Sequence, residues 1–296
     1  MALDLPPNID FHPLGAALYH GKYHTTLLVT NCRRNQSTIE VFELSVKNPT
    51  KSTWRRSLSH ELIPNGNAIL PVSSTQFYVT NDHYFRRKEH KYLHMSESYL
   101  ALPLSFTTFV DFSGNNIKAR KVVFGQRAAN GITATPDLDM VFIAESTRGG
   151  FGVYKRTEDN SLDFQEYVKI NGHTDNVHFH ADGYINAENW GNSAVYAGLH
   201  PNIVRLVKFV KGIQNAPSWI VSARPAREKM EGDPSDYKGP LHRARADKET
   251  WDVRTEFQDA GEWFGGATGA IVDKQRGVMI GGGLYDANGA FICHKT

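Results

Sequence analysis

Four side chains with oxygen donors occupy corresponding places in an internal repeat of this sequence. They are Asn67, Asn130, Asp175 and Asn176. Calcium takes roughly six to eight oxygen ligands, whereas zinc prefers about four nitrogen or sulfur ligands. A set of amides with one carboxylate therefore predicts a single Ca²⁺ site. One alternative stays open, because Asn and Asp at strand starts also hydrogen-bond their own turns.

Two histidines follow strands close to these donors in the repeat. His83 lies within Thr80-Asn-Asp-His-Tyr-Phe85, and His200 lies within Gly198-Leu-His-Pro-Asn202. Either imidazole is suited to serve as a general base or to stabilise charge near a metal. The simpler interpretation, a histidine that hydrogen-bonds a loop backbone, is equally open for both.

Other classes of site find little support. His178 and His180 share one side of a predicted strand and could bind a metal as a pair, but an exposed polar face is the favoured interpretation. The chain has no G-x-S-x-G elbow, no phosphate-binding G-x-x-x-x-G-K, no H-E-x-x-H and no dinucleotide fingerprint.

The elements that must position these residues are short strands. Runs rich in Val, Ile, Phe, Tyr and Thr recur about 20 times, each closed by a turn residue. Helical periodicity is convincing in only one place. Many short strands separated by polar turns predict an all-β sandwich, barrel or propeller.

The internal repeat favours the propeller. Its copies start at Asn67, Asn130, Asp175 and Gly266, with a weaker copy at Gly15. A period near ~45 residues with four strands per unit is typical of a β-propeller, and the strands predict about five blades. Because first strands surround the central channel of a propeller, the four donors are expected to converge there. We expect residues 1–296 to form one such domain.

Two segments depart from the repeat. Residues 86–98 consist of good helix formers, and we expect a helix that lies over one mouth of the propeller as a lid; the alternative is a solvated helix without a role. Residues 224–249 carry seven cations and six anions and almost nothing apolar. Such a composition cannot bury a core, which predicts a long mobile loop.

The composition limits the partners. Hydrophobic residues make up 40% and charged residues 22%, and 33 Lys and Arg against 31 Asp and Glu give a net charge of +2. This balance gives no reason to expect nucleic acid or an anionic membrane as partner. No apolar run approaches the roughly 20 residues of a membrane span. The absence of a visible secretory signal, with two unpaired cysteines, favours a cytoplasmic location.

Several motifs together resemble the serum paraoxonase/arylesterase family of calcium-dependent six-bladed propellers. The resemblance runs from about Phe11 to the C-terminus. It is carried by Leu27-Leu-Val-Thr-Asn31, Phe77-Tyr-Val-Thr-Asn-Asp-His-Tyr-Phe85, Ala129-Asn-Gly-Ile132, Phe142-Ile-Ala-Glu145 and Asp175-Asn176 with His200-Pro-Asn202. Family members hydrolyse lactones and aryl esters, and some hydrolyse organophosphates.

The resemblance implies roles for individual residues. Ligands of the catalytic calcium match Asn67, Asn130, Asp175 and Asn176; pocket-lining positions match His83, His200 and Thr268; and a lid helix matches residues 86–98. With Asp175 as both ligand and base, and His83 or His200 assisting, the chain is expected to be a calcium-dependent hydrolase of a small lactone or ester.

The chain departs from the family pattern at several positions. The family's catalytic histidine pair falls at Leu14 and Cys32, and a ligand of a second, structural calcium falls at Ala68. A further glutamate belongs to a first blade that we expect the chain to lack, as does the disulfide partner of Cys293. We therefore expect at most one, weakly bound calcium ion.

These departures leave two alternatives to hydrolysis. One is a strictosidine synthase-like enzyme of natural-product biosynthesis, a related six-bladed propeller whose site no longer activates water. The other is a non-catalytic propeller that binds a ligand or partner.

Overall fold

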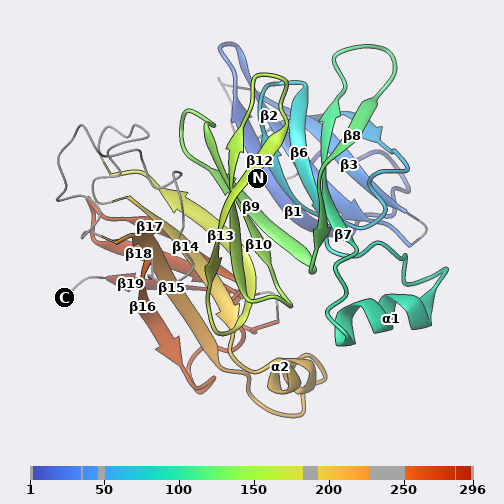
Figure 1. Cartoon of the computed structure of the whole chain (residues 1–296). Helices are drawn as coiled ribbons and strands as arrows, with labels where there is room; N and C mark the ends of the chain where they lie inside the picture. Colours follow the sequence, from blue (N-terminus) through green and yellow to red (C-terminus); the bar gives the residue numbers. More distant parts are fainter. Residues whose placement is uncertain are drawn as a thin grey trace. The chain divides into compact units, whose positions relative to one another are not determined.

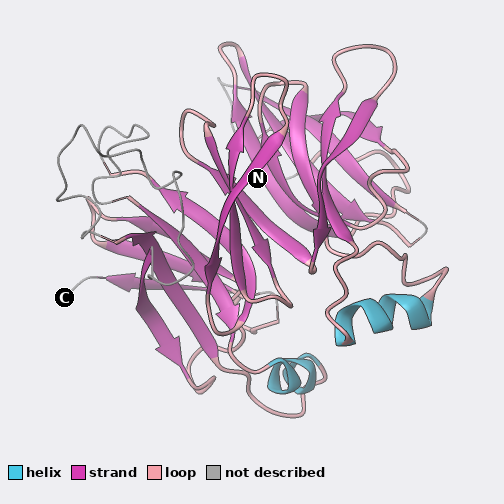
Figure 2. Cartoon of the chain, viewed as in Figure 1, coloured by secondary structure: helices cyan, strands magenta, loops and turns pink. Residues whose placement is uncertain are grey.

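The computed structural model describes residues 3–34, 36–45, 51–182, 193–226, 251–283 and 285–294. In these residues the chain forms nineteen strands and two helices, so strands dominate the structure (Figure 2). In each sheet the strands follow one another along the chain, and the neighbouring strands of the first, second, fourth and fifth sheets pair antiparallel. The all-β class is thereby confirmed.

Five sheets follow in chain order, each a meander of neighbouring strands (Figure 1). The first contains β1 (Pro13–His20), β2 (His24–Cys32), β3 (Ser37–Ser45) and β4 (Ser52–Leu58), and the second contains β5 (Gly66–Pro71), β6 (Gln76–Asn81), β7 (Ser105–Asp111) and β8 (Lys118–Gln126). The third contains β9 (Ala129–Ala134), β10 (Met140–Glu145), β11 (Gly150–Arg156) and β12 (Leu162–Lys169).

The fourth sheet contains β13 (His173–His180), β14 (Ala194–His200), β15 (Ser218–Pro225) and β16 (Trp251–Asp259). The last has three strands, β17 (Gly269–Asp273), β18 (Val278–Gly282) and β19 (Ala290–His294). Repeated antiparallel meanders of four strands are the blades of a β-propeller. The five blades agree with the repeat, and the six-bladed form is not confirmed, since the described residues hold five sheets.

The chain groups into two compact units. The first comprises Met1–Ile132 with Glu158–Leu162, and the second comprises Thr133–Thr157 with Asp163–Thr296. Each unit has its own core of side chains from successive blades. Leu28, Ile39, Phe77 and Val110 pack together in the first unit, whereas Phe142, Phe151, Val195 and Trp251 pack together in the second.

Strand composition follows position within a blade. All residues of β10 and β14 are buried, and both strands read as nearly continuous apolar runs. The outermost strands β4, β8 and β16 mix buried and exposed positions. Side chains alternate between the two faces of a strand, so full burial requires neighbours on both faces. In the second unit the rings of Phe142 and Phe179, from adjacent blades, stack with centroids 5.6 Å apart.

The predicted helix begins later than expected. Helix α1 spans Lys91–Tyr99, whereas residues 86–90 form a turn in which the His90 N–H donates to the Arg86 carbonyl, 2.9 Å away. Arg86, Arg87 and Lys88 precede the helix, and cations are unfavourable at the positive end of the helix dipole. The expected span of 86–98 was therefore wrong at its start.

A second helix, α2 (Ile203–Val210), was not expected. Its N-cap Asn202 accepts a hydrogen bond from the Arg205 N–H at 3.0 Å, the usual role of Asn at a helix start. Six of its eight residues are apolar, a run that also fits a strand. Neither described helix is long and apolar enough to cross a membrane.

The expected mobile loop begins too early. Arg224 and Pro225 belong to β15, where they pair with Asp252 and Trp251 of β16. Residue 226 follows the strand, and the remainder of the segment, 227–249, lies outside the described residues.

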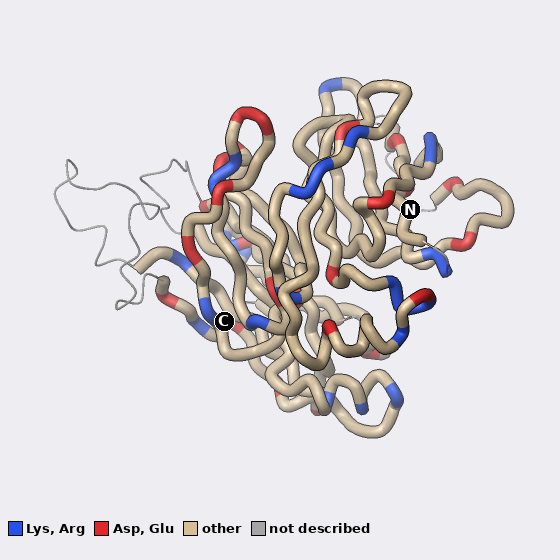
Figure 3. The backbone as a smooth tube through the Cα atoms, turned by 45° about the vertical axis from the view of Figure 1, so that its right-hand side comes forward, with Lys and Arg blue, Asp and Glu red and all other residues tan. Residues whose placement is uncertain are grey.

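Acidic and basic residues are interspersed along the chain (Figure 3), and one acid lies fully inside the first blade. Glu40 of β3 has no exposed surface. Burial alone would raise the pKa of Glu40, but hydrogen bonds from Ser57, Thr38, Trp54 and Asn31 outweigh it and lower the pKa to about 2. Arg33 adds an ion pair at 2.7 Å. The buried carboxylate thus ties three strands and the β2–β3 connection together.

The substitution Glu40→Gln is expected to lower the free energy of unfolding by about 3 kcal/mol at pH 7, the equivalent of the pKa shift. Because the pKa of Glu40 is lower in the folded than in the unfolded state, its ionised carboxylate stabilises the fold fully at pH values above 4.5. This stabilisation is lost as the pH falls toward about 2. The stability difference between wild type and variant should therefore shrink over that interval in urea titrations.

Glu43→Gln is the matched control, because Glu43 lies on the same strand in an exposed ion pair with Arg55 and should change stability by less than about 1 kcal/mol. Equal losses in the two variants would contradict the role assigned to Glu40.

Candidate active site

Buried hydroxyls mark the point where one blade passes to the next. Ser37, Ser105 and Ser218 each begin the third strand of a blade and are almost completely buried. Each hydroxyl accepts a hydrogen bond from the backbone N–H at the start of the following blade. The pairs are Gly66 to Ser37 at 3.2 Å, Ala129 to Ser105 at 2.9 Å and Ala267 to Ser218 at 2.9 Å.

Three first strands then carry a β-bulge, in which two residues lie opposite one residue of the second strand. The bulges are Leu14–Gly15 opposite Thr30, Asn67–Ala68 opposite Thr80 and Asp175–Asn176 opposite Gly198. A bulge increases the local twist and redirects side chains. Three of the four predicted calcium ligands thus lie in bulges, and the fourth, Asn130, is the second residue of β9.

In the first unit, Thr80 joins the bulge to the next blade. Its hydroxyl accepts a hydrogen bond from the Ala68 N–H at 3.0 Å and donates one to the Asn130 carbonyl at 2.6 Å. On the other side, a Cβ atom added to Gly15 would lie 2.1 Å from the Asn67 carbonyl oxygen. The starts of β1, β5 and β9 are therefore adjacent, and Asn67 and Asn130 are brought to the same part of this unit.

In the second unit, Asp175 is paired with His200. The Asp175 Oδ2 atom lies 3.0 Å from Nε2 of His200, whose side chain is only 9% exposed. The Nδ1 atom of His200 is buried and has no hydrogen-bond partner in the described part of the chain. This pair unites two of the residues that the sequence marks for catalysis.

A junction between consecutive blades also lies beside this pair, where the bulge of β13 meets the start of β17. The Asn176 N–H donates to the Thr268 carbonyl at 2.9 Å, just before β17. A Cβ atom at Gly198 would lie 2.3 Å from that carbonyl oxygen, so only glycine allows this approach. The structure thus places Asp175, Asn176, His200 and Thr268 together.

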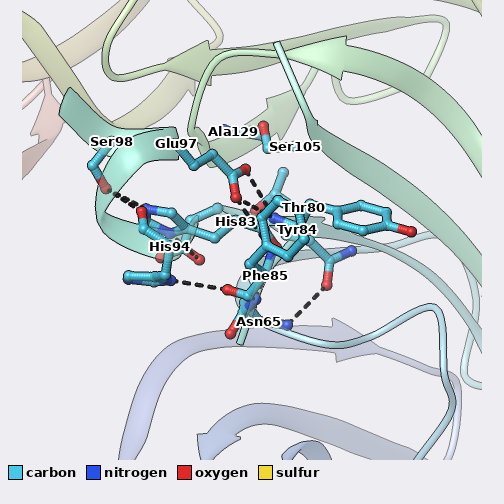
Figure 4. A network of polar contacts seen from close by, with 12 residues as sticks. Asn65, Thr80, His83, Tyr84, Phe85, His94, Glu97, Ser98, Ser105 and Ala129 are labelled. Atoms are coloured by element: carbon cyan, nitrogen blue, oxygen red, sulfur yellow. Dashed lines mark hydrogen bonds and ion pairs between the residues drawn. The ribbon is translucent and has the colours of Figure 1, made fainter. Parts of the chain in front are cut away.

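The third candidate base, His83, follows β6 and contacts helix α1 (Figure 4). Its Nε2 atom lies 2.7 Å from the Ser98 hydroxyl, Nδ1 lies 3.0 Å from Asp82 Oδ1, and its ring stacks on His94 at 3.8 Å. Burial lowers the pKa of His83, but the Asp82 carboxylate and then the charge of Glu97 outweigh it and raise the pKa overall. Both ring nitrogens thus face groups of the protein itself.

Glu97 holds the loop after His83 against the helix. This buried carboxylate accepts hydrogen bonds from the backbone N–H groups of Tyr84, at 2.8 and 3.0 Å, and of Phe85, at 3.3 Å (Figure 4). From the other side, the Asn65 amide donates to the His83 and Phe85 carbonyls. The expected lid helix is therefore anchored to the loop that carries His83, and its role as a lid stays a prediction.

Leu14 and Cys32, the positions that match the family's histidine pair, line one cleft of the first unit. The cleft has a volume of about 640 Å³ and is also lined by Gly66 and Asp82. Leu14 is 44% exposed. Burial, with a further contribution from the Asp82 charge, raises the pKa of the Cys32 thiol to about 11, so it is protonated at neutral pH and a poor nucleophile. Cys32 and Cys293 are both free thiols.

Sequence reasoning missed the residues that support the candidate site. The serines that receive the next blade occur at the same phase of the repeat, as the first residue of each third strand, and this regularity was available as a signal. Thr80 and Glu97 offered no such signal. Their partners are backbone atoms of other segments, and these contacts depend on strand register.

The family described as Arylesterase matches residues 4–229. The chain belongs to the paraoxonase/arylesterase family. Serum paraoxonase/arylesterase 2 of Bos taurus is 30% identical over 210 residues, which cover 71% of this chain and 54% of that protein. Serum paraoxonase/arylesterase 1 of Homo sapiens is 30% identical over 211 residues, with the same coverage of 71% and 54%. The chain spans about half the length of the curated relatives it matches.

Among solved structures, a protein from Lactobacillus plantarum has a TM-score of 0.51 at 10% identity, covering 96% of this chain and 81% of that chain. At that identity the likeness concerns the fold alone.

The predicted donors in each unit are amide and carboxylate oxygens, the atom type that a hard cation prefers. Asn67 is 9% exposed, and its side chain makes no hydrogen bond to the described residues. The Asp175 side chain is 20% exposed, with Oδ2 directed to His200. No three His, Cys, Asp or Glu side chains are grouped as a metal site within the described ranges, so His178 and His180 gain no third ligand there. The meeting of all four predicted donors stays a prediction.

Thr80→Val is expected to lower the free energy of unfolding by about 1–3 kcal/mol, because it leaves the Ala68 N–H and the Asn130 carbonyl without the hydroxyl that both contact. Valine keeps the shape and the β-branching, so packing is preserved. Thr80→Ser is the control, since it keeps the hydroxyl. Chemical unfolding should rank the serine variant above the valine variant; the reverse order would contradict the junction described for Thr80.

Proposed function

We propose that this chain is a hydrolase of lactones or aryl esters that depends on one bound calcium ion. Membership of the paraoxonase/arylesterase family supports hydrolysis of a carboxylic ester bond. The observation that carries the proposal is the bulge at Asp175 and Asn176, where a partly exposed carboxylate is fixed by a buried histidine. Asp175 and Asn176 would hold the ion, and Asn67 and Asn130 stay predicted ligands. When bound, calcium would polarise the substrate carbonyl and stabilise the developing oxyanion.

The chain's own residues must then supply a proton acceptor. Cys32 cannot serve, because its thiol remains protonated, and Leu14 has no polar atom. Asp175 is the candidate acceptor, because its carboxylate is partly exposed and it shares a bulge with Asn176, another predicted donor. His200 Nε2, 3.0 Å away, orients this carboxylate and can share the proton that it receives.

Asp175 and His200 are sufficient to account for the path of the proton. A water molecule loses a proton to Asp175 as its oxygen bonds to the carbonyl carbon. The ester C–O bond then breaks, and the proton passes to the departing alkoxide or phenoxide. For a lactone, the acid and the alcohol remain in one product molecule.

A non-catalytic ligand-binding role is the second candidate. It is favoured by one observation, the apolar Leu14 and the protonated Cys32 at the positions of the family's histidine pair. Absence of turnover on any substrate of a lactone and aryl ester panel, with calcium present, would favour this role over hydrolysis.

Asp175→Asn is expected to lower kcat/KM for phenyl acetate and for a δ-lactone by about 100-fold or more, because it removes the proton acceptor while keeping the shape. A chelator should abolish turnover by the wild type, and added calcium should restore it. Asp163→Asn is the matched control, because Asp163 is an exposed carboxylate of β12 in the same unit. Chelator-insensitive turnover, or equal activity in the two variants, would contradict the proposed function.

A further inference from the structure

The cleft that contains Leu14 and Cys32 is strongly basic. It has a volume of about 640 Å³, within the range of small-molecule sites. Two segments of the first unit contribute its cations, the β2–β3 connection and the turn that precedes α1. The lining cations are Arg33, Arg34, Arg86, Arg87 and Lys88. Asp82 is the single acidic residue among the lining side chains of the described chain.

This concentration of charge is local. The whole chain carries a formal charge of only +2 and intersperses both signs (Figure 3). A cleft lined by one sign of charge, with walls of low dielectric, concentrates the field and attracts ligands of the opposite sign. The cleft thus combines a hollow of small-molecule size with a local excess of positive charge.

Internal partners neutralise some of these cations and leave others available. Arg33 is occupied by Glu40 at 2.7 Å and Ser57 at 2.8 Å, and Arg86 pairs with Glu89 at 3.3 Å. Arg34 and Arg87 are exposed, and neither forms an ion pair with a described residue. Asp10 accepts a hydrogen bond from the backbone N–H of Arg34 at 3.0 Å and also interacts with its charge. The Arg34 and Arg87 guanidinium groups, whose planar donors match a carboxylate or phosphate, nevertheless form no ion pair with a described residue.

Within the first unit, the cleft also adjoins Asn67, one of the predicted calcium ligands. Gly66, which lines it, immediately precedes Asn67, and the Cys32 thiol lies 3.7 Å from the Gly66 carbonyl oxygen. Leu14 and Pro64 give the lining an apolar part. A ligand with a hydrophobic body and one anionic group matches this arrangement.

We propose that the cleft binds the anionic group of a small molecule, and that the substrate is an ester or lactone carrying a carboxylate or phosphate at a distance from the scissile bond. The assignment of the ligand as substrate rests on the proposed function; the binding of the anion does not. Arg34 and Arg87 hold the anion, and the apolar lining contacts the body of the molecule.

Binding is tested first, with ligands that cannot be hydrolysed at an ester. Isothermal titration calorimetry compares benzoate and phenyl phosphate with neutral benzamide, using the full chain. We expect one or both anions to bind, more weakly as salt is added, and benzamide to bind at least about tenfold more weakly. The comparison of benzoate with phenyl phosphate identifies the preferred anion.

The double variant Arg34→Gln/Arg87→Gln is expected to weaken anion binding about tenfold or more. Arg55→Gln is the matched control, because Arg55 is an exposed arginine of the same unit outside the cleft, paired with Glu43. Circular dichroism confirms that the variants are folded. Benzamide binding as tightly as benzoate, no anion binding, or unchanged anion binding by the double variant would overturn the proposal.

Hydrolysis is tested separately, with 4-acetoxybenzoate and phenyl acetate. The ratio of kcat/KM for the charged to the neutral ester should exceed one in the wild type and fall about tenfold in the double variant, with the Arg55→Gln ratio unchanged. A ratio that does not respond overturns the assignment of the ligand as substrate. If neither ester is hydrolysed, the proposed function fails, and the calorimetric result still decides whether the cleft is an anion site.

Discussion

The junction between consecutive blades is the constraint on which the rest of this structure depends. Each blade must deliver its first strand beside the previous one, where backbone atoms approach too closely for ordinary packing. Buried serines receive the first N–H of the next blade, and glycines at positions 15 and 198 leave room for a neighbouring carbonyl. The bulges that hold three of the candidate ligands lie in the same first strands.

The polar groups of the candidate site are held by the fold before any ligand binds. Asp175 is oriented by His200, and the loop of His83 is fixed by Glu97 and Asn65. Preorganisation of this kind lets a site act on developing charge without first reorganising its own dipoles. Two of the departures from the family pattern, Leu14 and Cys32, lie in one cleft, which is also lined by five cationic side chains.

Much of the fold could be predicted from the sequence, because its signals are local. Alternating or continuous apolar runs marked the strands, and the repeated starts at Asn67, Asn130 and Asp175 marked the blades. Helix α2 was missed because its six apolar residues of eight fit a strand as well, and the N-cap Asn202 was considered only as part of the motif that contains His200. Helix α1 was extended too far, into a basic turn that opposes the helix dipole.

The candidate site was less predictable, because its contacts are set by pairing register. Sequence position indicated which residues begin a repeat, but not that Asn67–Ala68 and Asp175–Asn176 would form bulges opposite single residues. The same limit applies to Thr80, which contacts two blades through one hydroxyl. A single sequence does not encode these long-range pairings as a visible pattern.

In the proposed function, oxygen donors of the first strands bind one hard cation. Calcium titration by isothermal calorimetry tests it most directly, with wild type compared with Asn67→Ala. We expect one site per chain in the wild type and an affinity at least about tenfold lower in the variant, because an oxygen ligand is lost. No binding at millimolar calcium, or equal affinity in the two proteins, would contradict it.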